Sequence, residues 1–300
     1  MSGNDISEIA VISGKGGTGK TTITASFASL AQNLLLADCD VDASNLHLIL
    51  DPTVEKTEEF SGSQVAVKEP GCIECGKCEE VCRFDAVTDD YEIDELKCEG
   101  CGTCVYACPV DVLKLKEIVT GEVYESRTRY GPMVHAKLGI GEEASGKLVT
   151  KVKDSSRRKA KEMGKELILI DGSPGIGCPV IASISGADLV VLVTEPTLSG
   201  IHDLERVYQM AEHFDIHTCV VVNKYDLNPD ITERIREFCD ENSITLAAEL
   251  PYDKMVTEAM IQGKSIVEFD DAEGSEIHDS IVSLWDRVLD KLDELKDQDE

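Results

Sequence analysis

The sequence predicts an α/β fold in which a mostly parallel sheet is covered by helices on both faces, and three observations support this. Short apolar, β-prone runs recur along the chain, several of them separated by helix-length segments. Their hydrophobicity is continuous rather than alternating, which is typical of strands buried on both faces. This alternation of strand-like runs and helix-length segments is interrupted between about Val65 and Ile118, where eight of the twelve cysteines lie. We therefore expect a small inserted α+β domain.

The predicted elements follow from these runs. Residues 9–12, 34–37, 167–170, 189–193 and 220–222 are expected to be strands. Glycine-separated β-prone pieces within 122–153, at 133–138 and 147–152, favour a β-ribbon. Near the C-terminus, apolar residues at a spacing of three to four predict a helix that packs on the core; they are Ile281, Leu284, Val288, Leu292 and Leu295. We place the first part of the α/β domain at 1–64, the insertion at 65–118 and the second part at 119–300.

Composition narrows the class of function. The formal net charge of −29 disfavours DNA, RNA and anionic lipid as partners, because these negatively charged partners bind to clusters of Lys and Arg. No export signal precedes the first apolar run, and no stretch of about 18 apolar residues could span a membrane. We expect a cytoplasmic protein without a membrane partner. Cysteines in a reducing compartment are more often metal ligands than disulfides.

A glycine-rich motif follows the first predicted strand and leads into a helix-forming stretch. It reads G-x-x-x-x-G-K-T from Gly14 to Thr21 and is a phosphate-binding P-loop in its expected context, so we expect a P-loop NTPase rather than a plain glycine-rich turn. The predicted ATP/ADP-binding residues are Gly14, Gly16, Gly17, Thr18, Gly19, Lys20, Thr21 and Thr22. Lys20 would neutralise the β- and γ-phosphates, and Thr21 would ligate Mg²⁺.

Lys15 makes the motif K-G-G-T-G-K-T, which resembles the deviant Walker A motif of the MinD, ParA, nitrogenase iron protein and Mrp group. The resemblance implies a homodimer in which Lys15 reaches the partner's nucleotide. It further implies that Asp40 orients the attacking water and that Asp171 holds the Mg²⁺ hydration shell. Gly172–Gly177 resembles switch II. Asn223 and the loop at Pro251 resemble the adenine-reading positions.

Two cysteine runs have the C-x2-C-x2-C-x3-C spacing of bacterial ferredoxins. The resemblance implies two [4Fe-4S] clusters, each held by three cysteines of one run and the last cysteine of the other. The expected sets are Cys72, Cys75, Cys78 with Cys108, and Cys98, Cys101, Cys104 with Cys82. Arg83 stands after the first run where the pattern has Pro. Structural zinc is the alternative, but it usually pairs C-x2-C knuckles at longer separation.

The remaining four cysteines are less informative. Cys178 follows switch II, in a place resembling a cluster-bridging cysteine of the nitrogenase iron protein, although we expect a buried thiol there. Cys39, Cys219 and Cys239 lie in or beside apolar segments and are expected in the core.

The nearest resemblance is to MinD-superfamily ATPases with an inserted ferredoxin domain, although Ser44 stands where that group leads us to expect Pro. Three functions remain open. The first is ATP-gated electron transfer to a partner metalloenzyme. The second is an iron-sulfur or metallocofactor maturation factor of the Mrp type, which is disfavoured because no C-x-x-C follows Cys108. The third is a MinD/ParA-like positioning ATPase, disfavoured by the acidic composition.

Overall fold

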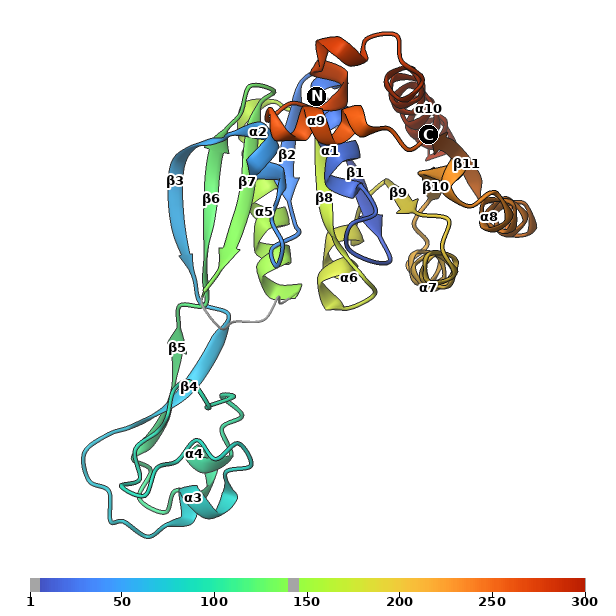
Figure 1. Cartoon of the computed structure of the whole chain (residues 1–300). Coiled ribbons are helices and arrows are strands. Elements are labelled where there is room, and N and C mark those ends of the chain that lie inside the picture. The colour runs from blue at the N-terminus through green and yellow to red at the C-terminus, as the bar shows by residue number, and fades with distance from the viewer. Residues whose placement is uncertain (1–5, 140–145, 300) are drawn as a thin grey trace. The chain divides into compact units, whose positions relative to one another are not determined.

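The computed structural model describes residues 6–139 and 146–299 (Figure 1). Its contacts divide the chain into two compact units. Among the described residues, the larger unit contains Ile6–Thr57, Val123–Lys137 and Gly146–Asp299, and the smaller unit contains Glu58–Glu122 with Leu138 and Gly139. The smaller unit extends beyond the predicted limits of 65 and 118 because β-type pairing continues there: Thr120 N donates to Phe60 O at 2.8 Å. Each unit is described by itself.

The larger unit is built on a nine-stranded sheet with the order β11-β10-β9-β1-β8-β2-β7-β6-β3. Pairing is parallel from β11 through to β7, so the predicted α/β fold with a mostly parallel sheet is confirmed. The strands are β1 (Ser7–Ser13), β2 (Leu34–Asp38), β3 (Thr53–Phe60), β6 (Gly121–Arg127), β7 (Pro132–Leu138), β8 (Leu167–Pro174), β9 (Leu189–Thr194), β10 (Thr218–Asn223) and β11 (Thr245–Leu250).

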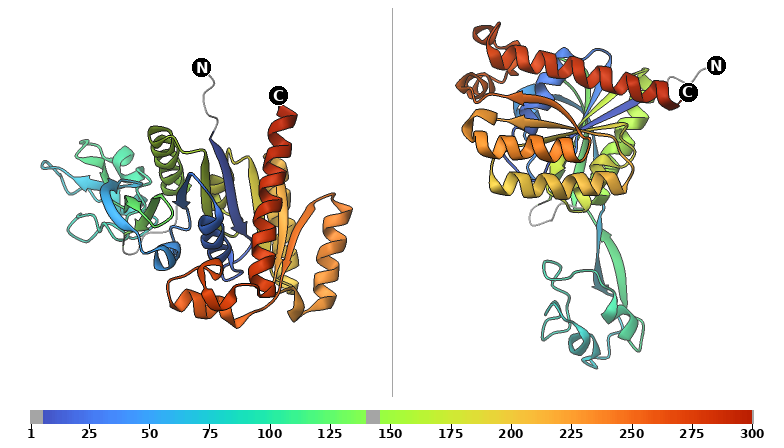
Figure 2. Two further views of the ribbon diagram at one scale, coloured as in Figure 1. Left: turned by 90° about the horizontal axis from the view of Figure 1, so that it is seen from above. Right: turned by 90° about the vertical axis from the view of Figure 1, so that its right-hand side faces the viewer.

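Helices cover both faces of this sheet (Figures 1 and 2). One face carries α1 (Lys20–Leu30), α2 (Leu46–Leu50), α9 (Lys254–Ile261) and α10 (Glu276–Asp299). The other carries α5 (Gly146–Met163), α6 (Cys178–Ile184), α7 (Leu198–His213) and α8 (Pro229–Glu241). Three short 3-10 helices complete the unit: η1 (Tyr225–Leu227), η2 (Ile266–Glu268) and η3 (Asp270–Ala272).

The core explains why these segments form strands and helices. Every residue of β1, β2 and β9 is buried, as expected for central strands with helices on both faces. The apolar stripe of α10 is also buried, which confirms the predicted packing helix. Its Trp285 lies against Phe27 of α1, with ring centroids 4.8 Å apart. None of the helices within residues 6–139 and 146–299 combines the length and hydrophobicity needed to cross a bilayer.

One predicted strand is wrong. Met133–Leu138 lies in β7 as expected, but Lys147–Val152 lies in helix α5. Leu148, Val149 and Val152 are buried on one side of that helix, and the stripe continues through small residues such as Ser156 and Ala160. Because these small residues carry little hydrophobic signal, the sequence showed only a short β-branched piece instead of a four-turn amphipathic pattern.

The smaller unit pairs β4 (Ser63–Lys68) antiparallel with β5 (Leu113–Ile118) and holds two short helices, α3 (Lys77–Val81) and α4 (Thr103–Ala107). The two cysteine runs have matching backbones. Gly76 and Gly102 precede the helices with φ of 72° and 74°, a left-handed conformation that glycine adopts readily. Cys82 and Cys108 end them with φ, ψ of −75°, 118° and −71°, 115°. The sequence repeat is therefore also a structural repeat.

Candidate functional site

The P-loop lies between β1 and α1 and borders a cavity of about 670 Å³, a size typical of small-molecule sites. The cavity-lining residues of the motif are Gly16, Gly17, Gly19, Lys20, Thr21 and Thr22. Gly14 instead lies against α7, where a Cβ would stand 2.3 Å from that of Asp203. Thr18 is buried, and its hydroxyl has no hydrogen-bond partner among the described atoms.

Lys20 and Asp40 meet inside this cavity. The Lys20 ammonium lies 3.2 Å from the Asp40 carboxylate, and the two side chains are only 6% and 7% exposed. Lys20 comes from the first turn of α1, and Asp40 follows the end of β2. The structure therefore brings together the predicted phosphate-binding cation and the predicted water-orienting carboxylate. The carboxylate neutralises the buried ammonium.

Asp171 lies beside the P-loop helix. Its two carboxylate oxygens accept hydrogen bonds from Thr21 Oγ1 at 2.7 Å and from Thr24 Oγ1 at 3.1 Å. The parallel register of β2 and β8 places Asp38 directly opposite Asp171. Burial, and then the nearby charge of Asp171, raises the pKa of Asp38 to about 8, and burial also raises the pKa of Asp171. Clustered carboxylates next to a threonine hydroxyl are a donor set that suits Mg²⁺, whose charge would favour their ionised forms.

The rest of the cavity is largely apolar. Its wall residues come from α2, β11, α9 and α10; they include Leu48, Ile49, Leu250, Val256, Met260, Ile261, Ile277 and Ile281. Thr22 Oγ1 lies 3.4 Å from Met260 Sδ, so α9 reaches the P-loop helix. A polar, glycine-rich floor facing an apolar wall is what a ligand with a phosphate end and a flat organic end requires.

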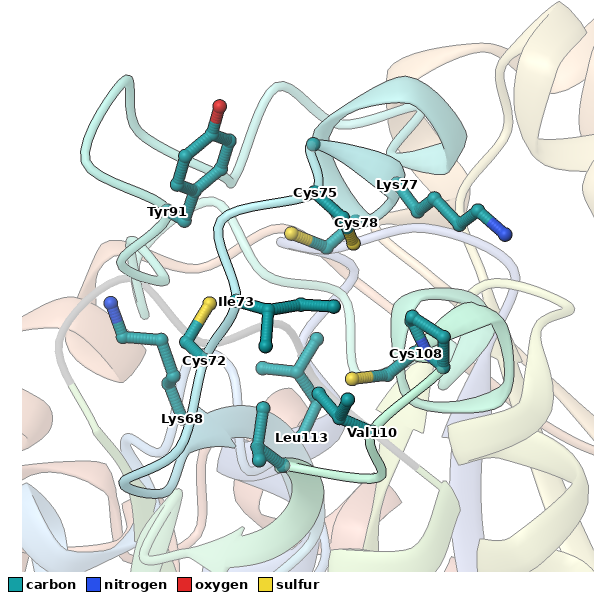
Figure 3. A pocket seen from close by; sticks show the side chains of 13 residues that line it. Lys68, Cys72, Ile73, Cys75, Lys77, Cys78, Tyr91, Cys108, Val110 and Leu113 are labelled. Atoms are coloured by element: carbon teal, nitrogen blue, oxygen red, sulfur yellow. The ribbon is translucent and has the colours of Figure 1, made fainter.

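The cysteines of the smaller unit gather around two hollows. The first is bordered by Cys72, Cys75, Cys78 and Cys108, and their sulfur atoms face it from two separate stretches of chain (Figure 3). Ile73, Val110 and Leu113 form its apolar side. The second hollow is bordered by Cys82, Cys98, Cys101 and Cys104. Three cysteines of one run and the last of the other thus share each hollow.

Backbone N–H groups point at several of these sulfurs. Ala86 N lies 3.4 Å from Cys82 Sγ, and Ala66 N lies 3.4 Å from Cys98 Sγ. Such N–H···S contacts stabilise thiolates that hold iron-sulfur clusters and tune their potential. Within the described residues, no three His, Cys, Asp or Glu side chains converge on a point where a single metal ion could bind. The residues around each hollow fit a four-thiolate cluster in number and chemistry.

Comparison with known proteins identifies the larger unit. Residues 9–266 match the CobQ/CobB/MinD/ParA nucleotide binding domain. The chain belongs to this family. It is an ATPase of the MinD/ParA type. An uncharacterised protein of Methanocaldococcus jannaschii is 37% identical over 226 residues, which cover 74% of this chain and 80% of that protein.

Two further similarities concern the fold and a short stretch of sequence. The septum site-determining protein MinD of Pyrococcus horikoshii, solved with Mg-ADP, has a TM-score of 0.58 at 18% identity and covers 95% of this chain and 96% of its own. One component of the ion-translocating oxidoreductase complex of Methanosarcina acetivorans is 48% identical over 54 residues, which are 17% of this chain and 20% of that protein. The P-loop fold is thereby confirmed.

Lys15, the lysine typical of the MinD/ParA group, does not point into the cavity. Its ammonium lies 3.2 Å from Thr197 Oγ1 and 3.7 Å from the Glu195 carboxylate. Glu195 also pairs with Lys224 at 2.5 Å. The loop after β9 thus holds Lys15 away from the nucleotide pocket of its own chain. Glu195 was not foreseen, because nothing local in the sequence marks a residue that meets Lys15 only through the pairing of β1 with β9.

The two predicted adenine-side residues differ in placement. Asn223, at the end of β10, lines the cavity, and its amide Nδ2 donates to Thr18 O at 2.8 Å. Pro251 is not among the described residues that line the cavity, although Leu250, immediately before it, is. The loop that contains Pro251 is held by a different contact, because Tyr252 N donates to Asp226 Oδ1 at 2.7 Å.

The prediction of a buried thiol at Cys178 is wrong. This residue begins α6 and is exposed, because residues two apart on a helix point to nearly opposite sides and Val180 takes the buried side of the first turn. Cys39, Cys219 and Cys239 are buried as expected. Of the expected switch II segment, Gly172, Ser173 and Pro174 still belong to β8. Sequence reasoning missed Thr24 as a partner of Asp171, although its position one turn after Lys20 on α1 was a usable signal.

Proposed function

We propose that this ATPase couples nucleotide-dependent dimer switching to electron transfer through two [4Fe-4S] clusters in the smaller unit. The observation that carries the proposal is the sorting of eight cysteines into two groups of four around two hollows, each group drawn from both runs. A cubane needs four thiolates, and the ferredoxin spacing supplies them in this crossed manner. When bound, such clusters carry single electrons. The 54-residue similarity to an oxidoreductase component supports the same class of chemistry.

The chain's own residues would perform the nucleotide chemistry. Lys20 would move from Asp40 to the β- and γ-phosphates, which leaves Asp40 free to accept a hydrogen bond from the attacking water. Thr21 would bind Mg²⁺, with Asp171 beside it to hold water ligands. The Mg-ADP bound by the Pyrococcus MinD supports this assignment.

A homodimer with ATP at its interface is part of the proposal. Lys15 does not line the cavity of its own chain, and its side chain is 32% exposed. In the part of the chain that the structure describes, its ammonium is held by an ion pair with Glu195 and by hydroxyl contacts. Releasing it toward a partner's phosphate would exchange one partly solvated ion pair for another, at a small net cost. The dimer would then report nucleotide state to a redox partner protein.

The test is an anaerobic redox titration, followed by electron paramagnetic resonance, with and without MgATP. A coupling of about 1–3 kcal/mol is typical between linked sites, and it corresponds to roughly 45–130 mV for a one-electron couple. We expect a shift in this range for the wild type and none for Lys20→Ala. Stoichiometric iron and sulfide with identical potentials in both states would contradict the coupling. Protein without iron and sulfide would contradict the clusters themselves.

The alternative is a role in metallocofactor maturation. It is distinguished from electron transfer by whether the protein keeps its iron or passes it to another protein. An assembly factor would transfer labelled iron to an apo-protein in an ATP-dependent reaction. Beyond Cys108, the described cysteines offer little for a labile site, because Cys219 and Cys239 are buried and only Cys178 is exposed. We therefore expect iron to be retained through many ATP turnovers. Loss of half or more to an acceptor would favour maturation.

A further inference from the structure

Arg129 lies in the short turn between β6 and β7 and binds three other segments at once. Its guanidinium forms a two-pronged ion pair with Glu268 of η2, with N···O distances of 2.8 and 2.9 Å. The same group donates to Ile49 O and to Gly263 O, each at 3.0 Å. Arginine suits this place because its planar fork presents several donors in fixed directions. Its contacts therefore fix the spacing of α2, the end of α9 and η2.

Two of these segments form the apolar wall of the nucleotide cavity. Ile49 is itself a lining residue, and its carbonyl is one of the acceptors. Gly263 lies two residues after the end of α9, whose Met260 and Ile261 also line the cavity. The two segments approach each other closely, since a Cβ on Gly263 would lie 3.9 Å from Ile49 O. Arg129, which does not itself line the cavity, ties them together.

Neighbouring groups stabilise the ion pair between Arg129 and Glu268. Burial is the largest single influence on the pKa of Glu268 and by itself would raise it, but hydrogen bonds from Arg129, together with the backbone hydrogen bond from Ser265, other smaller contributions and the charge of Arg129, lower that pKa to about 2. Glu268 also accepts from Ser265 N at 2.9 Å, as half of a capping box that starts η2. The Arg129 guanidinium further lies over the ring of Tyr130, 4.7 Å from its centroid. Such a bidentate, partly buried pair is worth more than an ordinary surface ion pair.

We propose that Arg129 is a positioning residue for nucleotide binding, which sets the wall formed by α2 and α9 at the distance that the bound nucleotide requires. Arg129 does not itself line the cavity, so it acts through Ile49 and Gly263 rather than by touching the ligand. Its loss should loosen both wall segments and weaken binding, while Lys20 and Asp40, which are not among the contacts of Arg129, keep their geometry. Loss of Arg129 should therefore change KM and Kd rather than kcat.

The test compares Arg129→Gln with Arg127→Gln in the full chain. Arg127 is the last residue of β6, two residues before Arg129. It is 72% exposed, pairs with Glu55 at 2.8 Å and does not line the cavity. Titration calorimetry with ATP and Mg²⁺, together with steady-state ATPase kinetics, gives Kd, KM and kcat. We expect Arg129→Gln to raise Kd and KM about tenfold and to leave kcat within about threefold. Arg127→Gln should leave all three within about twofold.

If Arg129→Gln does not fold, Arg129→Lys and Glu268→Gln test the same proposal. Lysine keeps the charge but cannot reach both carbonyls and the carboxylate, so it should recover only part of the affinity. Glu268→Gln removes the ion pair and should raise Kd by about threefold to tenfold. A purely structural role would lower the unfolding temperature without changing the Kd of the folded protein. A Kd within about twofold of wild type in folded Arg129→Gln, or in both other variants, would overturn the proposal.

Discussion

The Lys20 ammonium lies 3.2 Å from the Asp40 carboxylate inside the nucleotide cavity, and almost no water reaches either side chain. A buried ion pair with one partner removed leaves an uncompensated charge, which is costly. The pair therefore places a carboxylate next to the predicted phosphate-binding lysine without leaving either charge unpaired. The two residues should separate when a phosphate group takes over the neutralisation of Lys20.

Replacing Asp40 with Asn should remove hydrolysis but keep nucleotide binding. The amide matches the carboxylate in shape but is a poor proton acceptor, so we expect kcat to fall by about 10²- to 10⁴-fold. ATP affinity should stay equal or rise, because Lys20 is no longer held by a competing anion. Asp42→Asn is the matched control, since Asp42 lies in the same loop but is exposed. Phosphate-release kinetics and calorimetry measure both quantities; a kcat within tenfold of wild type would exclude the assigned role.

Replacing Lys15 with Gln should affect assembly and not the isolated site. Lys15 contacts Thr197 and Glu195 and lies outside the cavity of its own chain. We expect ATP affinity within about threefold of wild type, but loss of ATP-dependent dimers in sedimentation velocity. Lys264→Gln, which removes a surface pair with Asp270, should dimerise normally. If the Lys15 variant dimerises with ATP as well as wild type does, the proposed interface is wrong.

The chemistry was predictable wherever the relevant residues are neighbours in sequence. The P-loop from Gly14 to Thr21 depends on a strand-loop-helix context that local patterns reveal, and its placement beside a cavity follows from that context. The resemblance to bacterial ferredoxins likewise predicted the two groups of four cysteines that border the hollows. In contrast, the pairing of Asp38 with Asp171 depends on the register of β2 against β8, which neither segment specifies alone. Arg129 was missed for the same reason, because its four acceptors come from three distant segments.

His135 makes the larger unit sensitive to acid. It is 9% exposed, its Nε2 lies 2.9 Å from Ser126 Oγ, and its ring stacks on Tyr124. Burial, and then the nearby charge of His47, lowers the pKa of His135 from 6.5 to about 4. The unfolded chain then binds a proton at a higher pH than the folded chain, so stability is full above about pH 6.5 and falls as the pH drops toward 4.

The loss from this one group between pH 7.5 and pH 5 should be about 2 kcal/mol in the free energy of unfolding. His135→Gln keeps a hydrogen-bond partner for Ser126 and should remove that part of the pH dependence. His202→Gln, at an exposed position, should not. Urea unfolding followed by the fluorescence of Trp285, the one tryptophan of the chain, reports on the larger unit. Equal pH dependence in wild type and His135→Gln would contradict the assignment.

The crossed cysteine sets predict which substitutions share a spectroscopic effect. Cys72 and Cys108 border one hollow although they belong to different runs, whereas Cys72 and Cys82 belong to one run but border different hollows. Cys72→Ser and Cys108→Ser should therefore perturb the same paramagnetic signal, and Cys82→Ser should perturb the other. Each should lower the iron content by up to about half, because one of the two proposed clusters would lose a ligand. Cys178→Ser, at an exposed position outside both hollows, should change neither. Were Cys72→Ser and Cys82→Ser to alter one signal and Cys108→Ser the other, each run would hold its own cluster, and the crossed arrangement would be excluded.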